Sequence, residues 1–241
     1  SPPVGKFTSV SSGGAHNCGV RQDGRLACWG YNVDGRATPP AGQFRSVSAG
    51  AFHSCGVRSD FTLACWGSDE YGKATPPAGS FTSVSAGFWH TCAIRTDSTL
   101  VCWGRDTSGN DWSNVPGGAF ESVSSGREHS CALRLDGALL CSGRWTGFEE
   151  GDVWEEHSGR FRVVSAGFNE DCAISLESTV TCWSFGNWEQ SDAAVGSFRS
   201  ISAGGSHGCA VKVDDSVVCW GDDGQGQAAP PGAGSAPIAQ E

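Results

Sequence analysis

Twelve cysteines are the residues of this sequence whose type and spacing imply chemistry most directly. They fall into six pairs, each separated by ten residues, and none is left over. An even and regular cysteine framework is typical of disulfide bonds formed in an oxidising compartment. We therefore expect one disulfide per pair and a secreted or extracellular location. The pairs are Cys18 with Cys28, Cys55 with Cys65, Cys92 with Cys102, Cys131 with Cys141, Cys172 with Cys182, and Cys209 with Cys219.

Metal binding is the alternative use of the same cysteines. A histidine usually stands two residues before the first cysteine, so His53, Cys55 and Cys65 offer three potential zinc ligands. The sequence has no C-x-x-C motif, however, and one copy carries Glu170 where the histidine should stand. We favour disulfides, expect no metal or other cofactor, and assign the histidines a structural hydrogen bond. A ring of imidazoles that binds metal or senses pH is the alternative. The histidines are His16, His53, His90, His129 and His207.

An acidic stretch from Glu149 to His157 is the third candidate for chemistry. Its carboxylates could serve general acid–base catalysis or bind calcium. The stretch has no fixed ligand spacing, and the sequence has no nucleophile or phosphate-loop motif. We interpret it as a solvated acidic loop and expect that the protein is not an enzyme. A polysaccharide-active enzyme that uses this loop is the alternative. The carboxylates are those of Glu149, Glu150, Asp152, Glu155 and Glu156.

The cysteine pairs belong to a longer repeat. Each copy runs Phe-x-x-Val/Ile-Ser-(Ala/Ser)-Gly, then usually His-x-Cys, ten residues to the second Cys, and usually Trp-Gly. A period of this size indicates a repeat architecture. The copies begin at Phe7, Phe44, Phe81, Phe120, Phe161 and Phe198, which gives a period of 37 to 41 residues.

Strands must position the cysteines. In the second copy, residues 43–49, 53–58 and 62–66 alternate as strands do. If Cys55 faces Cys65, then Val57 faces Leu63 on the same side of the hairpin, and Gly56 faces Ala64 on the other. The Gly56 position is Gly or Ala in every copy, which would let a neighbouring sheet approach closely.

A fourth strand would complete each blade. We expect it at Lys73–Thr75, at the outer edge of the sheet, where the following prolines are tolerated. Four antiparallel strands repeated six times predict an all-β, six-bladed β-propeller with one disulfide in each blade. Residues 1–231 would form one closed domain in which the two termini pair to complete the last blade. We predict that residues 232–241 form a flexible tail.

These residues resemble a known family. The run SAG-x-x-H-x-C-(A/G)-(V/I)-R-x-D, followed by (A/V)-C-W-G and G-x-A-T-P-P-A-G, is similar to the repeat of the regulator of chromosome condensation family. It looks most like the cysteine-bearing version found in secreted bacterial proteins and in the ectodomains of crinkly-type plant receptor kinases. The resemblance covers the chain to about Pro231 and implies the propeller. It does not by itself imply a function, because that fold serves many.

Positions that break the repeat are the candidates for binding. They lie in the loop between the first and second strands and in the segment after the third, which emerge at the same end of a propeller. Their aromatic residues cluster in copies three to five, which predicts one composite site, because aromatic anchors carry much of the energy of recognition. Filling of gaps beside longer spacers is the alternative. The candidates are Phe52, Phe88, Trp89, Trp112, Arg127, Glu128, Trp145, Phe148, Trp154, Phe168 and Trp188.

Charge and hydropathy exclude some partners. The net charge of -10 argues against nucleic acid, and no apolar run is long enough for membrane insertion. The chain opens on SPPVGKF without a signal-peptide pattern, so we expect a mature or trimmed form. The sequence predicts an extracellular recognition module that binds a protein or a large carbohydrate ligand through one propeller face. A lectin is a further alternative.

Overall fold

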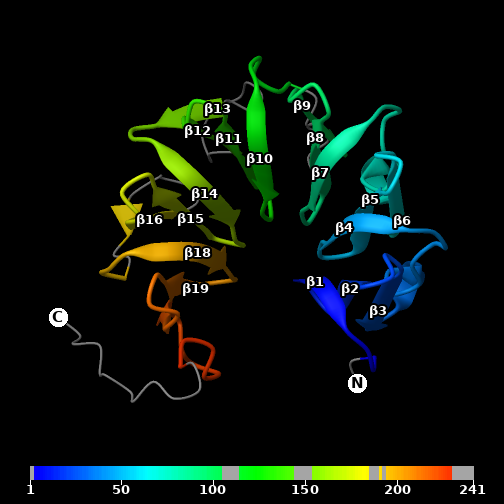
Figure 1. The fold of residues 1–241 in the computed structure, drawn as a ribbon, viewed down its shortest axis with the longest axis horizontal. Coiled ribbons are helices and arrows are strands. Elements are labelled where there is room, and N and C mark those ends of the chain that lie inside the picture. Colours follow the sequence, from blue (N-terminus) through cyan, green and yellow to red (C-terminus); the bar gives the residue numbers. More distant parts are fainter. Residues whose placement is uncertain (1–2, 105–113, 144–153, 185–189, 192–193, 230–241) are drawn as a thin grey trace.

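Six small antiparallel sheets stand side by side around a central axis and form an arc with one open side (Figure 1). We call them blades one to six in chain order. The computed structural model describes residues 3–104, 114–143, 154–184, 190–191 and 194–229. The all-β prediction is confirmed. No helix in these ranges is long and apolar enough to cross a membrane.

Three strands recur in every blade, in the order first, second, third. The first strands are β1 (Phe7–Ser12), β4 (Phe44–Ala49), β7 (Phe81–Ala86), β10 (Phe120–Ser125), β14 (Phe161–Ala166) and β18 (Phe198–Ala203). The second strands are β2 (His16–Arg21), β5 (His53–Arg58), β8 (His90–Arg95), β11 (His129–Arg134), β15 (Glu170–Ser175) and β19 (His207–Lys212). The third strands are β3 (Leu26–Gly30), β6 (Leu63–Gly67), β9 (Leu100–Gly104), β12 (Leu139–Gly143), β16 (Val180–Ser184) and β20 (Val217–Gly221).

The predicted hairpin register is confirmed. Cys55 pairs with Cys65, Gly56 with Ala64 and Val57 with Leu63, and the other five blades repeat this pattern. Each cysteine of a second strand therefore stands directly opposite the cysteine of the third strand in the same blade.

All six predicted disulfides are present, and no cysteine is free. Each bond joins the second and third strands of one blade at the same point. The bonds are Cys18–Cys28, Cys55–Cys65, Cys92–Cys102, Cys131–Cys141, Cys172–Cys182 and Cys209–Cys219.

The second cysteine of a pair is not buried equally in all blades. Cys28 in blade one is half-buried, whereas Cys102 in blade three is 3% exposed. Cys102 belongs to a buried cluster that includes Phe120 of blade four, and Trp154 of that blade packs against the cluster. Cys28 packs against Ala49 and Trp66 of blade two, so both cysteines contribute to packing between blades.

The prediction of a fourth strand at Lys73–Thr75 is wrong. The segment before it forms a short 3-10 turn, η2 (Glu70–Gly72), as does η1 (Val33–Gly35) in blade one. The Asp69 carboxylate accepts hydrogen bonds from Ala74 N–H at 2.7 Å and from the Thr75 hydroxyl at 2.7 Å, which closes the segment into a turn. Within the described ranges, a fourth strand occurs only in blades four and five, as β13 (Trp154–His157) and β17 (Gln190–Ser191).

The disulfide face of a blade packs against the blade that follows it in the chain, except in blade six, which has no following blade. The Cys131–Cys141 bond, Leu133 and Leu139 of blade four form one buried cluster with residues of blade five, namely Phe161, Ala173 and Trp183. The small residue opposite the cysteines makes room for this packing. A Cβ on Gly56 would lie 2.7 Å from Cδ1 of Phe44, so a larger side chain at this position would displace the buried phenyl ring of the same blade.

Two hydrogen bonds recur between neighbouring blades. A serine near the end of the first strand in each of blades one to five accepts a hydrogen bond from the next blade, as Ser48 Oγ does from Ala86 N–H at 2.9 Å. The repeated histidine reaches the residue before the next blade's first cysteine, as His53 Nε2 does to Thr91 Oγ1 at 2.7 Å. The same contact links His16 to Ser54, His90 to Ser130 and His129 to Asp171. The predicted structural role of these histidines is confirmed at four junctions between blades.

The predicted pairing of the two termini is not present in the described residues. No sheet joins blade one to blade six, and residues 225–229 lie in turns instead of a strand. Val10 of blade one is 65% exposed. Its counterpart in blade two, Val47, is half-buried because it packs against blade one. The arc is therefore open between β1 and β18 (Figure 1). The proposed tail, 232–241, lies outside the described residues.

Candidate recognition face

The two kinds of variable segment meet at one end of the arc, as predicted. Ser68, which follows β6, donates its N–H to the carbonyl of Phe52 in the loop between β4 and β5 at 3.0 Å. The Tyr71 ring, also after β6, lies 6.0 Å from the Trp89 ring in the next blade's loop. We call this the loop end, and we call the opposite end, with the turns between second and third strands, the hairpin end.

Repeated polar residues at the hairpin end serve the fold. The Asp60 carboxylate accepts hydrogen bonds from the Thr62 hydroxyl at 2.6 Å and N–H at 3.0 Å, and these bonds lower the pKa of Asp60. The Arg58 guanidinium lies 5.0 Å from the Phe44 ring and donates to the carbonyl of Ala41. Because their polar groups are used within the blade, these residues do not indicate a binding site.

A cavity of about 420 Å³ lies at the axis of the loop end. Its wall consists of the ends of the first strands and the glycines that follow them. Phe88 N–H donates to the carbonyl of Gly126 at 3.1 Å, and a Cβ on Gly87 would lie 2.6 Å from that same oxygen. The repeated glycine is thus required because neighbouring backbones touch there.

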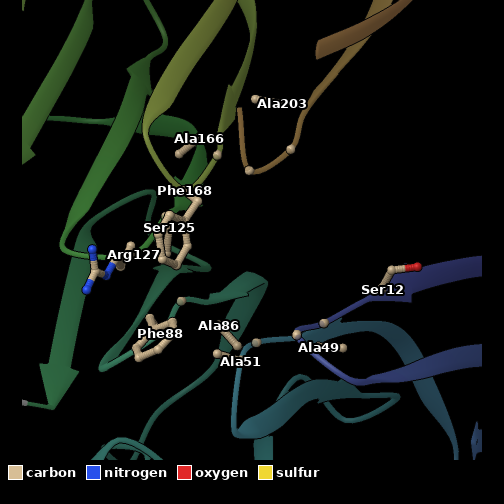
Figure 2. Close-up of a pocket in the computed structure, with 18 residues that line it drawn as sticks. Ser12, Ala49, Ala51, Ala86, Phe88, Ser125, Arg127, Ala166, Phe168 and Ala203 are labelled. Carbon is tan, nitrogen blue, oxygen red and sulfur yellow. The ribbon is translucent and has the colours of Figure 1, made fainter. Parts of the chain in front are cut away.

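Aromatic residues gather on one side of this cavity. The Phe88 ring lies 4.7 Å from the rings of both Phe52 and Trp89, and 5.9 Å from that of Phe168. The Arg127 guanidinium lies 4.6 Å from the Phe168 ring and 5.8 Å from the Phe88 ring. Figure 2 shows Phe88, Arg127 and Phe168 on the same wall, with the small residues Ser12 and Ala49 across from them. Five of the predicted candidates therefore form one cluster.

Glu128 lies beside this cluster. Its carboxylate is 3.5 Å from the Arg127 guanidinium, and both side chains are partly exposed. An exposed pair of this kind contributes little to stability, about 0 to 1 kcal/mol. The two charges are therefore available to a partner at the rim of the cavity.

Two buried cations underlie the cluster, and sequence reasoning missed them. Arg36 lies 5.2 Å from the Phe52 ring and 5.5 Å from the Tyr31 ring. Lys73 lies 5.9 Å from the Phe52 ring and 5.6 Å from the Trp89 ring, and burial lowers its pKa. Arg36 and Lys73 occupy the same position of the repeat, in Gly-Arg-Ala-Thr-Pro-Pro and Gly-Lys-Ala-Thr-Pro-Pro. This shared position was the sequence signal that could have indicated a common role for the two cations.

The comparison with protein families decides which repeat this is. A family model described as "Regulator of chromosome condensation (RCC1) repeat" matches residues 7–36, 44–73, 81–110, 120–144 and 198–227. The chain belongs to the RCC1 repeat family. The resemblance found in the sequence is thereby confirmed. The fifth repeat is not matched, and it is the one that carries Glu170 in place of histidine.

Solved structures with a similar fold include two receptor ectodomains. The CRINKLY WD40 ectodomain of the Arabidopsis thaliana receptor kinase ACR4 is 25% identical with a TM-score of 0.70, and the match covers 89% of this chain and 79% of that one. The ectodomain of the Physcomitrella patens receptor kinase CR4 is 23% identical with a TM-score of 0.72, covering 91% and 63%. This chain thus spans less than two thirds of the CR4 ectodomain.

Yeast RCC1 (Prp20), solved with Kap60 bound, is a more distant neighbour. It is 15% identical with a TM-score of 0.73, and the match covers 90% of this chain and 70% of that one. At this identity the likeness shows the propeller fold alone. A search of curated protein sequences found no match.

Trp154 lies away from the cluster, in the packing of the RCC1 blades. It pairs across the sheet with Ser142, which stands where other repeats have tryptophan. Its indole N–H donates to the carbonyl of Asn114 at 3.0 Å, as Trp66 does to the carbonyl of Arg36 at 2.9 Å. Trp154 on β13 therefore makes the indole hydrogen bond to the preceding blade that the third strand of this repeat, which has no tryptophan, cannot make.

The remaining predicted residues divide into two groups. Trp112, Trp145, Phe148 and Trp188 lie outside the described residues, as do Glu149, Glu150 and Asp152. Glu155 and Glu156 are exposed neighbours on β13, so their side chains point to opposite faces of the strand. Glu156 lies 3.5 Å from Arg160. The described part of the acidic stretch thus contains no pair of facing carboxylates for acid–base catalysis.

Proposed function

We propose that this chain is an extracellular recognition module that binds a protein segment at the loop end of the propeller. The observation that carries the proposal is the aromatic cluster of Phe52, Phe88, Trp89 and Phe168. Two of its members, Phe88 and Phe168, line the central cavity. These residues stand at positions where the repeat is free to vary, yet they converge. Large rigid aromatic side chains beside a concavity supply contact area at a low cost in side-chain entropy.

Two findings support the proposed location. All twelve cysteines are paired, and structural disulfides of this number persist in oxidising compartments. Two of the similar structures are receptor ectodomains. Both findings support a site of action outside the cytosol.

The repeat itself provides the variants that test this function. Ala51 and Ser206 occupy the positions of Phe88 and Trp89 in other blades, so Phe88→Ala and Trp89→Ser introduce residues that the fold already accepts. Phe61→Ser is the matched control, because Phe61 is an exposed aromatic residue at the hairpin end and Ser98 occupies its position in blade three.

The oxidised protein should be screened in parallel against a displayed random-peptide library and a glycan array. We expect peptide hits whose affinity falls about tenfold or more for Phe88→Ala and Trp89→Ser, with the folded state retained in both variants and no loss of affinity for Phe61→Ser. Equal binding by all four proteins would refute the face assignment. Glycan hits without peptide hits would replace this function with that of a lectin.

A further inference from the structure

The aromatic cluster continues outward over blades one and two. Tyr31, which follows β3, is 57% exposed, and Tyr71, in η2, is 41% exposed. Arg36 connects Tyr31 to Phe52, and Lys73 connects Phe52 to Trp89, which in turn contacts Tyr71. We call the whole set the aromatic strip. It consists of Tyr31, Phe52, Tyr71, Phe88, Trp89 and Phe168.

The cations within the strip hold the rings in place from below. Lys73 is fully buried, and its ammonium group donates to the Ser68 hydroxyl at 3.2 Å and to the Glu70 carbonyl at 3.1 Å. Arg36 is buried as well and donates to the carbonyls of Val33 and Ala51. Because both cations are covered, the part of the strip over blades one and two presents aromatic rings and not positive charge to a partner, whereas Arg127 is partly exposed beside Phe88 and Phe168.

The lysines and arginines of the described residues are distributed unequally between the two ends, whereas carboxylates occur at both. Most cations lie at the hairpin end, where they bind backbone carbonyls or acidic side chains of the turns. They are Lys6, Arg21, Arg25, Arg45, Arg58, Arg95, Arg134, Arg160, Arg162, Arg199 and Lys212. At the loop end only Arg127 is a partly exposed cation among these described residues, and Glu128 lies next to it.

Carboxylates border the strip instead. Asp34 and Glu70 are exposed in the two 3-10 turns, within three residues of Tyr31 and directly before Tyr71. One carboxylate oxygen of Asp34, Oδ2, lies 3.2 Å from the Arg36 guanidinium, and half of the Asp34 side chain is exposed to solvent. The chain as a whole carries a net charge of -10. The exposed charges beside Tyr31 and Tyr71 are thus carboxylates.

From this arrangement we infer that the strip binds an extended protein segment rich in lysine and arginine. Aromatic faces attract cations within about 6 Å of the ring centre, and neighbouring carboxylates add charge complementarity that steers the encounter. This inference rests on the proposed function and goes beyond it, because it assigns the chemistry of the partner. An acidic segment would meet like charges at Asp34 and Glu70 and is disfavoured.

Two labelled peptides test the inference. One is Gly-Lys-Ser-Arg-Gly-Lys-Ser-Arg-Gly, and the other has glutamate at each basic position. The variant Asp34→Asn/Glu70→Gln removes two charges beside the strip, and asparagine tolerates the positive φ of 61° at residue 34. Glu121→Gln/Glu177→Gln is the matched control, because it removes the same charge from exposed residues toward the hairpin end.

We expect fluorescence anisotropy to show binding of the basic peptide alone, weakening as salt rises. Asp34→Asn/Glu70→Gln should weaken it about three- to tenfold at low salt, whereas the control pair leaves it unchanged. No binding of the basic peptide at millimolar concentration, equal binding of both peptides, or equal loss in the control pair would overturn the inference. The proposed function would survive that failure if library peptides of another charge still depend on Phe88 and Trp89.

Discussion

His129 Nε2 lies 2.7 Å from Asp171 Oδ1, and both side chains are fully buried between blades four and five. Three other junctions place a serine or threonine hydroxyl at the position of Asp171. A buried carboxylate facing a histidine is a stronger contact than a hydroxyl, but it costs more when one partner is removed.

Asp171→Ala should therefore lower the free energy of unfolding by about 2 kcal/mol, because it removes the buried carboxylate that His129 Nε2 contacts. Asp171→Ser should cost only about 1 kcal/mol, since serine accepts this bond at the junctions of His16 and His90. Urea unfolding followed by tryptophan fluorescence measures both values. Equal losses in the two variants would show that the histidine bond contributes nothing specific.

Acid should destabilise the fold through the buried histidines. Burial lowers the pKa of His53 to about 3, with smaller contributions from the charges of Lys73 and His16, against 6.5 in the unfolded chain. Burial also lowers the pKa of His90, and that of His16. Between pH 6.5 and 3 the unfolded chain binds protons that the folded chain excludes, so stability falls as pH falls.

Each such histidine should contribute up to about 1.4 kcal/mol of lost stability per pH unit below about 6.5. His53→Gln should be less stable at neutral pH but lose less stability on acidification, because one proton-binding site has gone. Urea titrations at a series of pH values provide both slopes. If the variant and the parent protein have the same slope, His53 is not the group that titrates.

The six disulfides should not be equivalent in stability. Cys55 is fully buried against blade three, whereas Cys209 and Cys219 are half-buried on the open side of blade six. Replacing both cysteines of a pair with alanine removes a cross-link worth about 2–3 kcal/mol on the chain-entropy model. In blade two the replacement also leaves a cavity between blades, which adds to the loss.

Cys55→Ala/Cys65→Ala should therefore lower the unfolding midpoint more than Cys209→Ala/Cys219→Ala does. Thermal unfolding of the two variants under oxidising conditions compares them directly, and the fully reduced parent protein gives the lower limit. A larger loss from the blade six pair would indicate that its face is covered in solution.

The internal repeat explains what the sequence could predict. Six copies agree that Cys55 faces Cys65 and that Gly56 must be small, so both the register and the disulfides were deducible. Departures of a single copy from the repeat could not be deduced in this way. Blade four has Ser142 where other blades have tryptophan, and Trp154 on the fourth strand takes over that position. No repeated pattern in the sequence predicts such an exchange between strands. Likewise Lys73 alternates with small residues as a strand would, but the Asp69 carboxylate closes a turn there.

Lys73 was also hidden from sequence reasoning because lysine is almost never fully buried. Its position is arginine in blade one (Arg36) and glutamine in blade six (Gln227). Lys73→Arg should therefore keep both the stability and the environment of Trp89, because a guanidinium also stacks on aromatic rings.

Lys73→Gln retains a hydrogen-bonding group but removes the charge beneath the Phe52 and Trp89 rings. We expect a loss of about 1 kcal/mol in the free energy of unfolding, since cation–π contacts of this kind contribute about 0.5–2 kcal/mol. Near-ultraviolet circular dichroism should report the change around Trp89, and the affinity of peptides that depend on Trp89 should fall with it. If Lys73→Gln changes stability but not that affinity, the buried cation supports the blade junction without positioning the recognition face.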